Sequence, residues 1–150
     1  MYSKDMLIGI LLSAGKLDFN IERAKDSQIG YRVRVKIILR AEESFLRAVE
    51  RTLLQHEITS SYKEKESKTR PKPILKIGGI KNLYKLTELV PKLPDAKGEW
   101  ETFRELVELI SENKHRTSSG LDRILELKGL ITGKNNQRER NKENYLNMNI

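Results

Sequence analysis

The chain has 150 residues, of which 37% are hydrophobic and 33% charged, and its formal net charge at pH 7 is +8. This length suits one domain with a modest core. The absence of cysteine excludes disulfides, iron–sulfur clusters and thiolate zinc sites, and two histidines are too few for a three-histidine metal site. No apolar run in the sequence is long enough for a membrane span. We therefore expect a soluble, intracellular, basic protein that binds a polyanion and no membrane.

The first predicted element is an apolar helix over residues 6–15. Apolar residues lie on nearly every side of it, so we expect it to be buried all round. Gly9 and Ser13 are four residues apart and share one face, where a second helix can approach closely. The segment also faintly resembles a secretory signal, but it is short for one and Asp5 interrupts its charged head. A buried helix is the better interpretation.

Two strands are predicted next, at 17–22 and 31–40, because apolar and polar residues alternate in both. In the second strand one face is apolar, and the other carries Arg32, Arg34, Lys36 and Arg40, with Ile38 among them. The alternation predicts a sheet with one face on the core and one cationic face.

Helical spacing returns at 42–56, and two weaker strands are predicted at 58–64 and 72–78. The stretch 63–81 contains seven basic and two acidic residues. The polar composition of 134–150 indicates a disordered basic tail, which leaves residues 1–133 as the domain. Further helices are predicted at 80–90, at 99–112 and from Thr117 or Ser118 onward.

Residues 7–15, LIGILLSAG, resemble the signature of the LAGLIDADG homing endonucleases, with Ala14 where the family has an acid. Residues 76–83 resemble the family's fourth strand entering its next helix, and 114–121 resemble a late helix start. The resemblance extends over most of residues 6–131. It implies an α+β fold, the α-β-β-α-β-β-α saddle of this family, with extra C-terminal helices.

The family's architecture pairs two such units, whose curved sheets line the DNA major groove. Because this chain has one signature, the resemblance implies a homodimer formed through Leu7, Gly9, Ile10 and Ser13. A helix buried within a monomer is the alternative. A two-fold symmetric dimer would read a palindromic or nearly palindromic site.

The resemblance also implies Mg²⁺-dependent cleavage of both DNA strands, a hydrolase reaction that uses the eighth signature residue as metal ligand. The methyl group of Ala14 cannot bind a metal, and the backbone carbonyl of Ser13, also a ligand in relatives, lacks a charge. Replacement by Asp18 is disfavoured because it already lies on the next strand. Lys97 loosely matches a basic residue that relatives place near the scissile phosphate, or it is an ordinary linker lysine.

We therefore expect impaired Mg²⁺ binding and no cleavage, which leaves open whether this chain is an enzyme. Ala14 is either a natural loss in a degenerate relative or an engineered inactivating change. A second departure from the family is the apolar run at 37–39, where relatives often carry a polar residue.

DNA binding does not depend on the missing acid. Arginine suits guanine, asparagine suits adenine, glutamate can accept from cytosine, and lysines suit phosphates. A sheet face that is merely solvated and binds no DNA is the alternative.

The expected function is sequence-specific binding of double-stranded DNA. An intron maturase that binds RNA and a DNA-binding regulator are the alternatives. The residues predicted to contact DNA are Asn20, Glu22, Arg32, Arg34, Lys36, Ser61, Lys63, Lys72 and Lys76.

Overall fold

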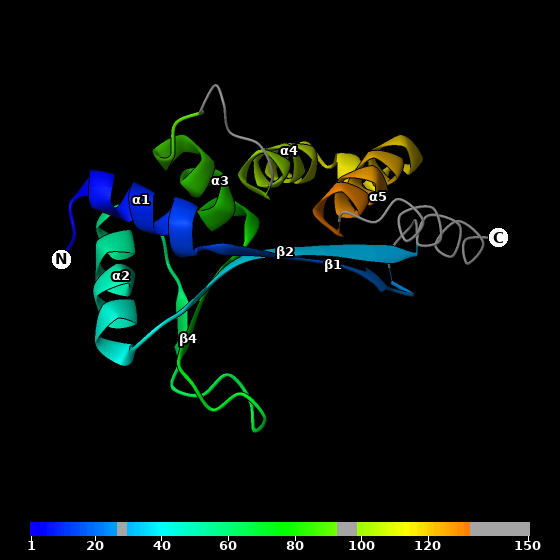
Figure 1. The fold of residues 1–150 in the computed structure, drawn as a ribbon. Helices are drawn as coiled ribbons and strands as arrows, with labels where there is room; N and C mark the ends of the chain where they lie inside the picture. Colours follow the sequence, from blue (N-terminus) through cyan, green and yellow to red (C-terminus); the bar gives the residue numbers. More distant parts are fainter. Residues whose placement is uncertain (27–29, 93–98, 133–150) are drawn as a thin grey trace. The chain divides into compact units, whose positions relative to one another are not determined.

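The computed structural model describes residues 1–26, 30–92 and 99–132 (Figure 1). It has an α+β fold, as the sequence predicted. The element order agrees with the expected α-β-β-α-β-β-α unit followed by further helices. The elements are α1 (Lys4–Ala14), β1 (Lys16–Arg23), β2 (Tyr31–Arg40), α2 (Glu43–Gln55), β3 (Ser61–Lys63), β4 (Ile74–Gly78), α3 (Ile80–Leu89), α4 (Glu99–Ser111), a short 3₁₀ helix η1 (Lys114–Arg116) and α5 (Ser118–Thr132).

The chain divides into two compact units, which we describe separately. Unit 1 contains residues 1–18 and 35–92, and unit 2 contains the rest of the chain. Each of the strands β1 and β2 has one end in unit 1 and its other end in unit 2. The boundary of one domain at residue 133 stays a prediction, because the proposed tail at 134–150 lies outside the described residues.

The four strands form one sheet in the order β1-β2-β4-β3. β4 pairs antiparallel with both β2 and β3, so that Ser61 and Ile38 flank Lys76 on either side, and Lys36 lies opposite Gly78. Paired residues point to the same side of a sheet. The sheet of unit 1 therefore has one polar face, with Lys36, Ser61 and Lys76, and one apolar face of fully buried residues such as Leu39 and Ile77.

Unit 1 buries the apolar face of this sheet together with α1, α2 and α3. Helix α1 contacts α2, which in turn packs on β3 and β4, and α3 contacts β4. Ser3 caps α1 by accepting a hydrogen bond from the Met6 amide. At its other end, a Cβ on Gly15 would lie 2.5 Å from the Leu11 carbonyl oxygen, so glycine is required there. The turn into β1 is thus fixed by the sequence.

Unit 2 packs its ends of β1 and β2 with α4 and α5. Helices α4 and α5 contact each other and η1, and Phe103, Leu106 and Ile124 are fully buried. The Lys128 ammonium on α5 lies 5.7 Å from the centre of the Phe19 ring on β1, within cation–π range. Of the two predicted starts of this helix, Thr117 or Ser118, Thr117 is the cap, because its hydroxyl accepts a hydrogen bond from the Gly120 amide.

Three sequence predictions need correction in detail. Strand β4 begins at Ile74, so Lys72 lies in the preceding loop rather than on the strand, and β3 is only three residues long. Helix α1 is not buried all round, because Met6 is 52% and Leu12 37% exposed. None of the helices among the described residues combines the length and apolar character needed to cross a membrane.

Candidate nucleic-acid interface

The polar face of unit 1 contains a cavity of about 530 Å³ lined by three lysines. Lys36, Lys63 and Lys76 come from the three strands β2, β3 and β4, and none of the other lining residues is acidic. The aliphatic part of Lys36 runs past Gly78, 3.5–3.9 Å from where a Cβ would stand, which is ordinary van der Waals contact. Like charges brought together around a cavity repel one another, and an anion relieves that repulsion. The remaining lining residues are Thr59, Ser60, Ser61, Gly78, Gly79 and Asn82.

Asn82, in the first turn of α3, holds the wall of this cavity. Its side-chain amide donates to the Thr59 hydroxyl and to the Gly78 carbonyl, both at 2.9 Å, and its oxygen accepts from the Thr59 amide at 3.1 Å. Gly79 precedes the helix with φ 87°, a left-handed conformation that favours glycine. The backbone before β3 and the end of β4 are therefore fixed relative to each other.

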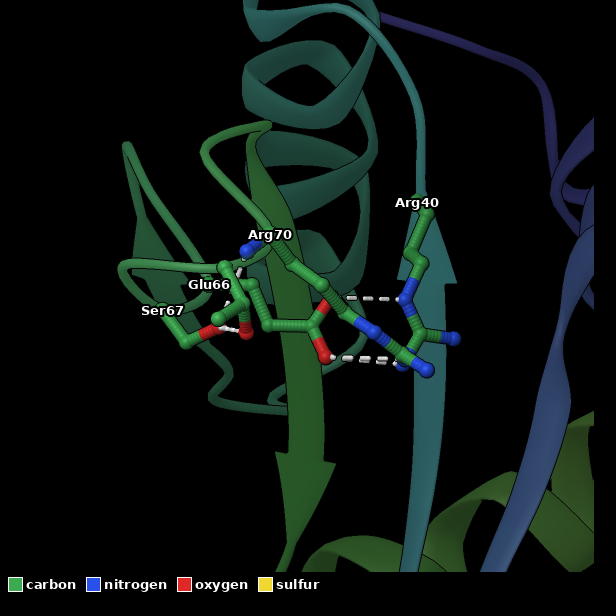
Figure 2. Close-up of polar contacts among 5 residues, drawn as sticks. Arg40, Glu66, Ser67 and Arg70 are labelled. Atoms are coloured by element: carbon green, nitrogen blue, oxygen red, sulfur yellow. Dashed lines mark hydrogen bonds and ion pairs between the residues drawn. The ribbon is translucent and has the colours of Figure 1, made fainter.

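A second cluster joins β2 to the loop at residues 64–73, which we call the β3–β4 loop. Arg40 donates to both carboxylate oxygens of Glu66, Nε to Oε1 at 2.7 Å and Nη2 to Oε2 at 2.9 Å (Figure 2). Arg70 lies beside the same carboxylate, with Nη1 3.5 Å from Oε2. The hydrogen bond from Arg40 lowers the pKa of Glu66 to about 2, although burial acts in the opposite direction. Glu66 is therefore ionised and paired at neutral pH.

Unit 2 carries the other predicted base-reading residues on its ends of β1 and β2. Asn20, Glu22, Arg32 and Arg34 are all exposed, whereas Phe19, Ile21 and Tyr31 between them are buried, as the alternation predicted. Both of these arginines already have acidic partners. Arg34 lies 3.1 Å from Glu22, and Arg32 lies 2.9 Å from Asp26. Exposed pairs of this kind contribute only about 0.2–1 kcal/mol, so a base edge can displace them.

The residues predicted to form the dimer contact on α1 divide into two buried and two exposed residues. Leu7 is 0% and Ile10 9% exposed within the chain's own unit 1, so their side chains are not available to a second copy. Gly9 and Ser13 are exposed, and they share the outward side of the helix with Met6 and Leu12. Apart from its two neighbours and the backbone of its own helix, no described residue has an atom within 4 Å of a Cβ built on Gly9. The packing of unit 1 therefore gives no reason for glycine at this position.

The residues near Ala14 do not fit a bound Mg²⁺. Ala14 is exposed at the end of α1 and offers no side-chain oxygen, and the Ser13 hydroxyl donates to the Gly9 carbonyl at 2.7 Å. Asp18 contributes to the electrostatic environment of Arg40 and helps to raise the pKa of that guanidinium, after the larger effect of the hydrogen bond to Glu66. Across the described ranges, no cluster of three or more histidine, aspartate or glutamate side chains is placed to hold a metal ion.

Sequence reasoning missed some of the residues that shape these sites. Glu66, Thr59 and Asn82 were not singled out, because each acts through contacts with residues far away in the sequence. The available signal was the presence of two acids, at 64 and 66, within a basic stretch, and it does not distinguish one from the other. Lys97, the predicted residue near the scissile phosphate, lies outside the described residues. Lys72 lies in the β3–β4 loop and lines a second cavity of about 830 Å³ beside Arg40 and Glu66.

Comparison with solved structures identifies the fold. The structure of the homing endonuclease I-TnaI matches with a TM-score of 0.75 and 18% sequence identity, over 97% of this chain and 99% of that protein. The LAGLIDADG meganuclease I-CpaMI, bound to uncleaved DNA, matches with a TM-score of 0.74 and 15% identity, over 100% of this chain. The fold is that of the LAGLIDADG homing endonucleases.

A third similar structure is I-SmaMI bound to an uncleaved DNA target in the presence of calcium ions, with a TM-score of 0.74 and 16% identity over 89% of this chain. This chain spans 46% of the length of I-SmaMI and 53% of that of I-CpaMI, so it corresponds to about half of each. No protein-family model and no curated protein matches the sequence.

Proposed function

We propose that this chain is a LAGLIDADG-family protein that binds double-stranded DNA sequence-specifically, inside the cell, and does not cleave it. The observation that carries the proposal is the polar sheet face, where lysines from three strands line one cavity without an acidic residue. The exposed Asn20 and Glu22 on β1 and the exposed Arg32 and Arg34 on β2 supply base-reading side chains in unit 2. The fold shared with DNA-bound I-CpaMI and I-SmaMI supports this choice of ligand.

The proposal includes a homodimer that reads a nearly palindromic site. This chain spans 53% of I-CpaMI, and two copies of it would provide a comparable extent of fold. The exposed side of α1, with Met6, Gly9, Leu12 and Ser13, is the proposed contact between the copies. Glycine within a helix costs about 1 kcal/mol relative to alanine, and the close approach of a second helix accounts for its use here.

The absence of cleavage follows from the donor groups near Ala14. Hydrolysis of a phosphodiester with Mg²⁺ needs a metal held by carboxylates next to the scissile phosphate, and Ala14 has none to offer. Family members that cut DNA would use the corresponding acid. The chain's own residues therefore support binding and orientation of DNA without the hydrolytic step.

The decisive experiment compares the chain with its Ala14→Asp variant on DNA that flanks its own gene, with Mg²⁺ present. We expect the chain itself to bind this DNA without cutting it, and the variant to cut it. Binding by both proteins without cutting by the variant would indicate a DNA-binding regulator. Preference for the host intron transcript over DNA would indicate an RNA maturase instead. Absence of binding to any nucleic acid would overturn the proposal.

A further inference from the structure

The β3–β4 loop presents four basic side chains to solvent. Lys65, Lys68, Arg70 and Lys72 are all exposed, and within the described part of the chain the three lysines form no ion pairs. The loop is anchored beside the sheet face that the proposed function assigns to DNA. Cationic side chains on a loop without fixed structure would have to be ordered on binding, which lowers affinity.

Backbone contacts give this loop a defined turn. The Glu66 amide donates to the Lys72 carbonyl and the Ser67 amide donates to the Arg70 carbonyl, both at 3.0 Å. The Ser67 hydroxyl accepts from the Arg70 amide at 3.1 Å. These bonds close the loop on itself, but they do not connect it to the rest of unit 1.

Glu66 supplies a connection to β2. Its side chain is only 17% exposed. Its two carboxylate oxygens accept hydrogen bonds from Nε and Nη2 of Arg40 on β2 (Figure 2). A bidentate pair of this kind fixes orientation as well as distance. Arg70, which is 67% exposed, approaches the same carboxylate with one nitrogen only. Most of its guanidinium therefore stays available to a ligand.

We propose that the β3–β4 loop is a preorganised surface for the backbone phosphates of a double-stranded nucleic acid, and that Glu66 is the positioning residue that holds it against β2. The inference rests on the proposed function and deepens it. Phosphate is the fitting ligand because the loop offers several separated cations and no side-chain arrangement that would read one base edge.

This role gives Glu66 an effect opposite to the one expected from its charge. Removing a negative charge from a basic surface strengthens attraction to a polyanion, so electrostatics alone predicts tighter binding by Glu66→Gln. Loss of a positioning contact predicts weaker binding, since the released loop must be ordered again in the complex. The direction of the change therefore separates the two explanations.

The test measures the affinity of the full chain for mixed-sequence duplex DNA over a range of salt concentrations. Glu64→Gln is the matched control, because Glu64 is an exposed acid in the same loop and forms no hydrogen bond or ion pair within the described residues. We expect Glu66→Gln to weaken binding by about two- to tenfold, the cost of ordering about one further side chain on binding. Its salt dependence should stay close to that of the unmodified chain, because the loop, once ordered in the complex, makes the same phosphate contacts. Glu64→Gln should bind as tightly as the unmodified chain or more tightly.

A charge-exchange variant distinguishes the loss of the Arg40–Glu66 ion pair from a general effect on folding. The double variant Arg40→Glu, Glu66→Arg keeps the net charge and allows the pair to form again, so it should recover part of the lost affinity. Thermal unfolding checks that each variant is folded at the assay temperature. Equal or tighter binding by Glu66→Gln overturns this inference and leaves the proposed function intact. If the unmodified chain binds no nucleic acid, the proposed function itself fails.

Discussion

Asn82 and Thr59 are joined by two reciprocal hydrogen bonds, although they lie 23 residues apart in the sequence. The bond from Asn82 to the Gly78 carbonyl adds the end of β4 to the same contact. One side chain thereby fixes the start of α3, the approach to β3 and the end of β4. These three segments form the wall of the lysine-lined cavity.

Replacement of Asn82 should affect both stability and binding. Asn82→Ala removes three hydrogen bonds, and we expect a loss of about 1–2 kcal/mol in the free energy of unfolding, measured by urea denaturation. Asn82→Asp keeps the acceptor for the Thr59 amide but places a negative charge beside Lys36 and Lys76. It should therefore weaken DNA binding more than Asn82→Ala does. The opposite order of affinities would contradict a role for this cavity in binding an anion.

Lys76 and Arg34 should differ in how they affect sequence preference. Arg34→Ala should weaken binding to the preferred site by about 1–3 kcal/mol and relax the preference at one base pair. Lys76→Ala should weaken binding to all sequences alike and make the log–log salt slope shallower by about 0.9. Competition binding against a randomised duplex library measures both effects. A uniform loss with Arg34→Ala would reassign that arginine to a phosphate contact.

Local sequence patterns predicted the elements and the faces of the sheet well. The alternation at 31–40 places Arg32 and Arg34 outward and Tyr31 and Val35 inward, as observed, because side chains on a strand point to opposite faces in turn. The start of the last helix at Thr117 or Ser118 was likewise predictable, since a cap depends on residues within one helical turn, and Thr117 takes this role.

Contacts between distant segments were not predictable in the same way. The composition of 6–15 indicated burial on every side, but burial depends on which side α2 covers, and Gly9 and Leu12 were left exposed. Similarly, residue 72 has the parity of Lys76, which lies on the polar face of β4. The two prolines at 71 and 73 and the turn held by Glu66 and Ser67 nevertheless keep it in the loop.

Gly9 provides a test of self-association through α1. Because a Cβ at this position meets no atom within 4 Å among the described residues beyond its own stretch of helix, Gly9→Ala should stabilise the isolated protomer by up to about 1 kcal/mol through helix propensity. Gly9→Leu should separate two closely packed helices and shift the protein to the monomer in analytical ultracentrifugation. Leu12→Ser is a second variant on the same side of the helix. Unchanged self-association in both variants would place the dimer contact elsewhere.

The Arg40–Glu66 pair predicts how the free energy of unfolding of unit 1 depends on pH. The pKa of Glu66 in the folded protein is about 2, below its ordinary value of 4.5, so the folded state favours the ionised form. Its stabilising contribution is therefore complete above about pH 4.5 and is lost as the pH falls toward 2. The free energy of unfolding of the chain and of Glu66→Gln, measured at several pH values, should converge across this interval. A difference between the two proteins that stayed constant down to pH 2 would mean that Glu66 is not held ionised by Arg40.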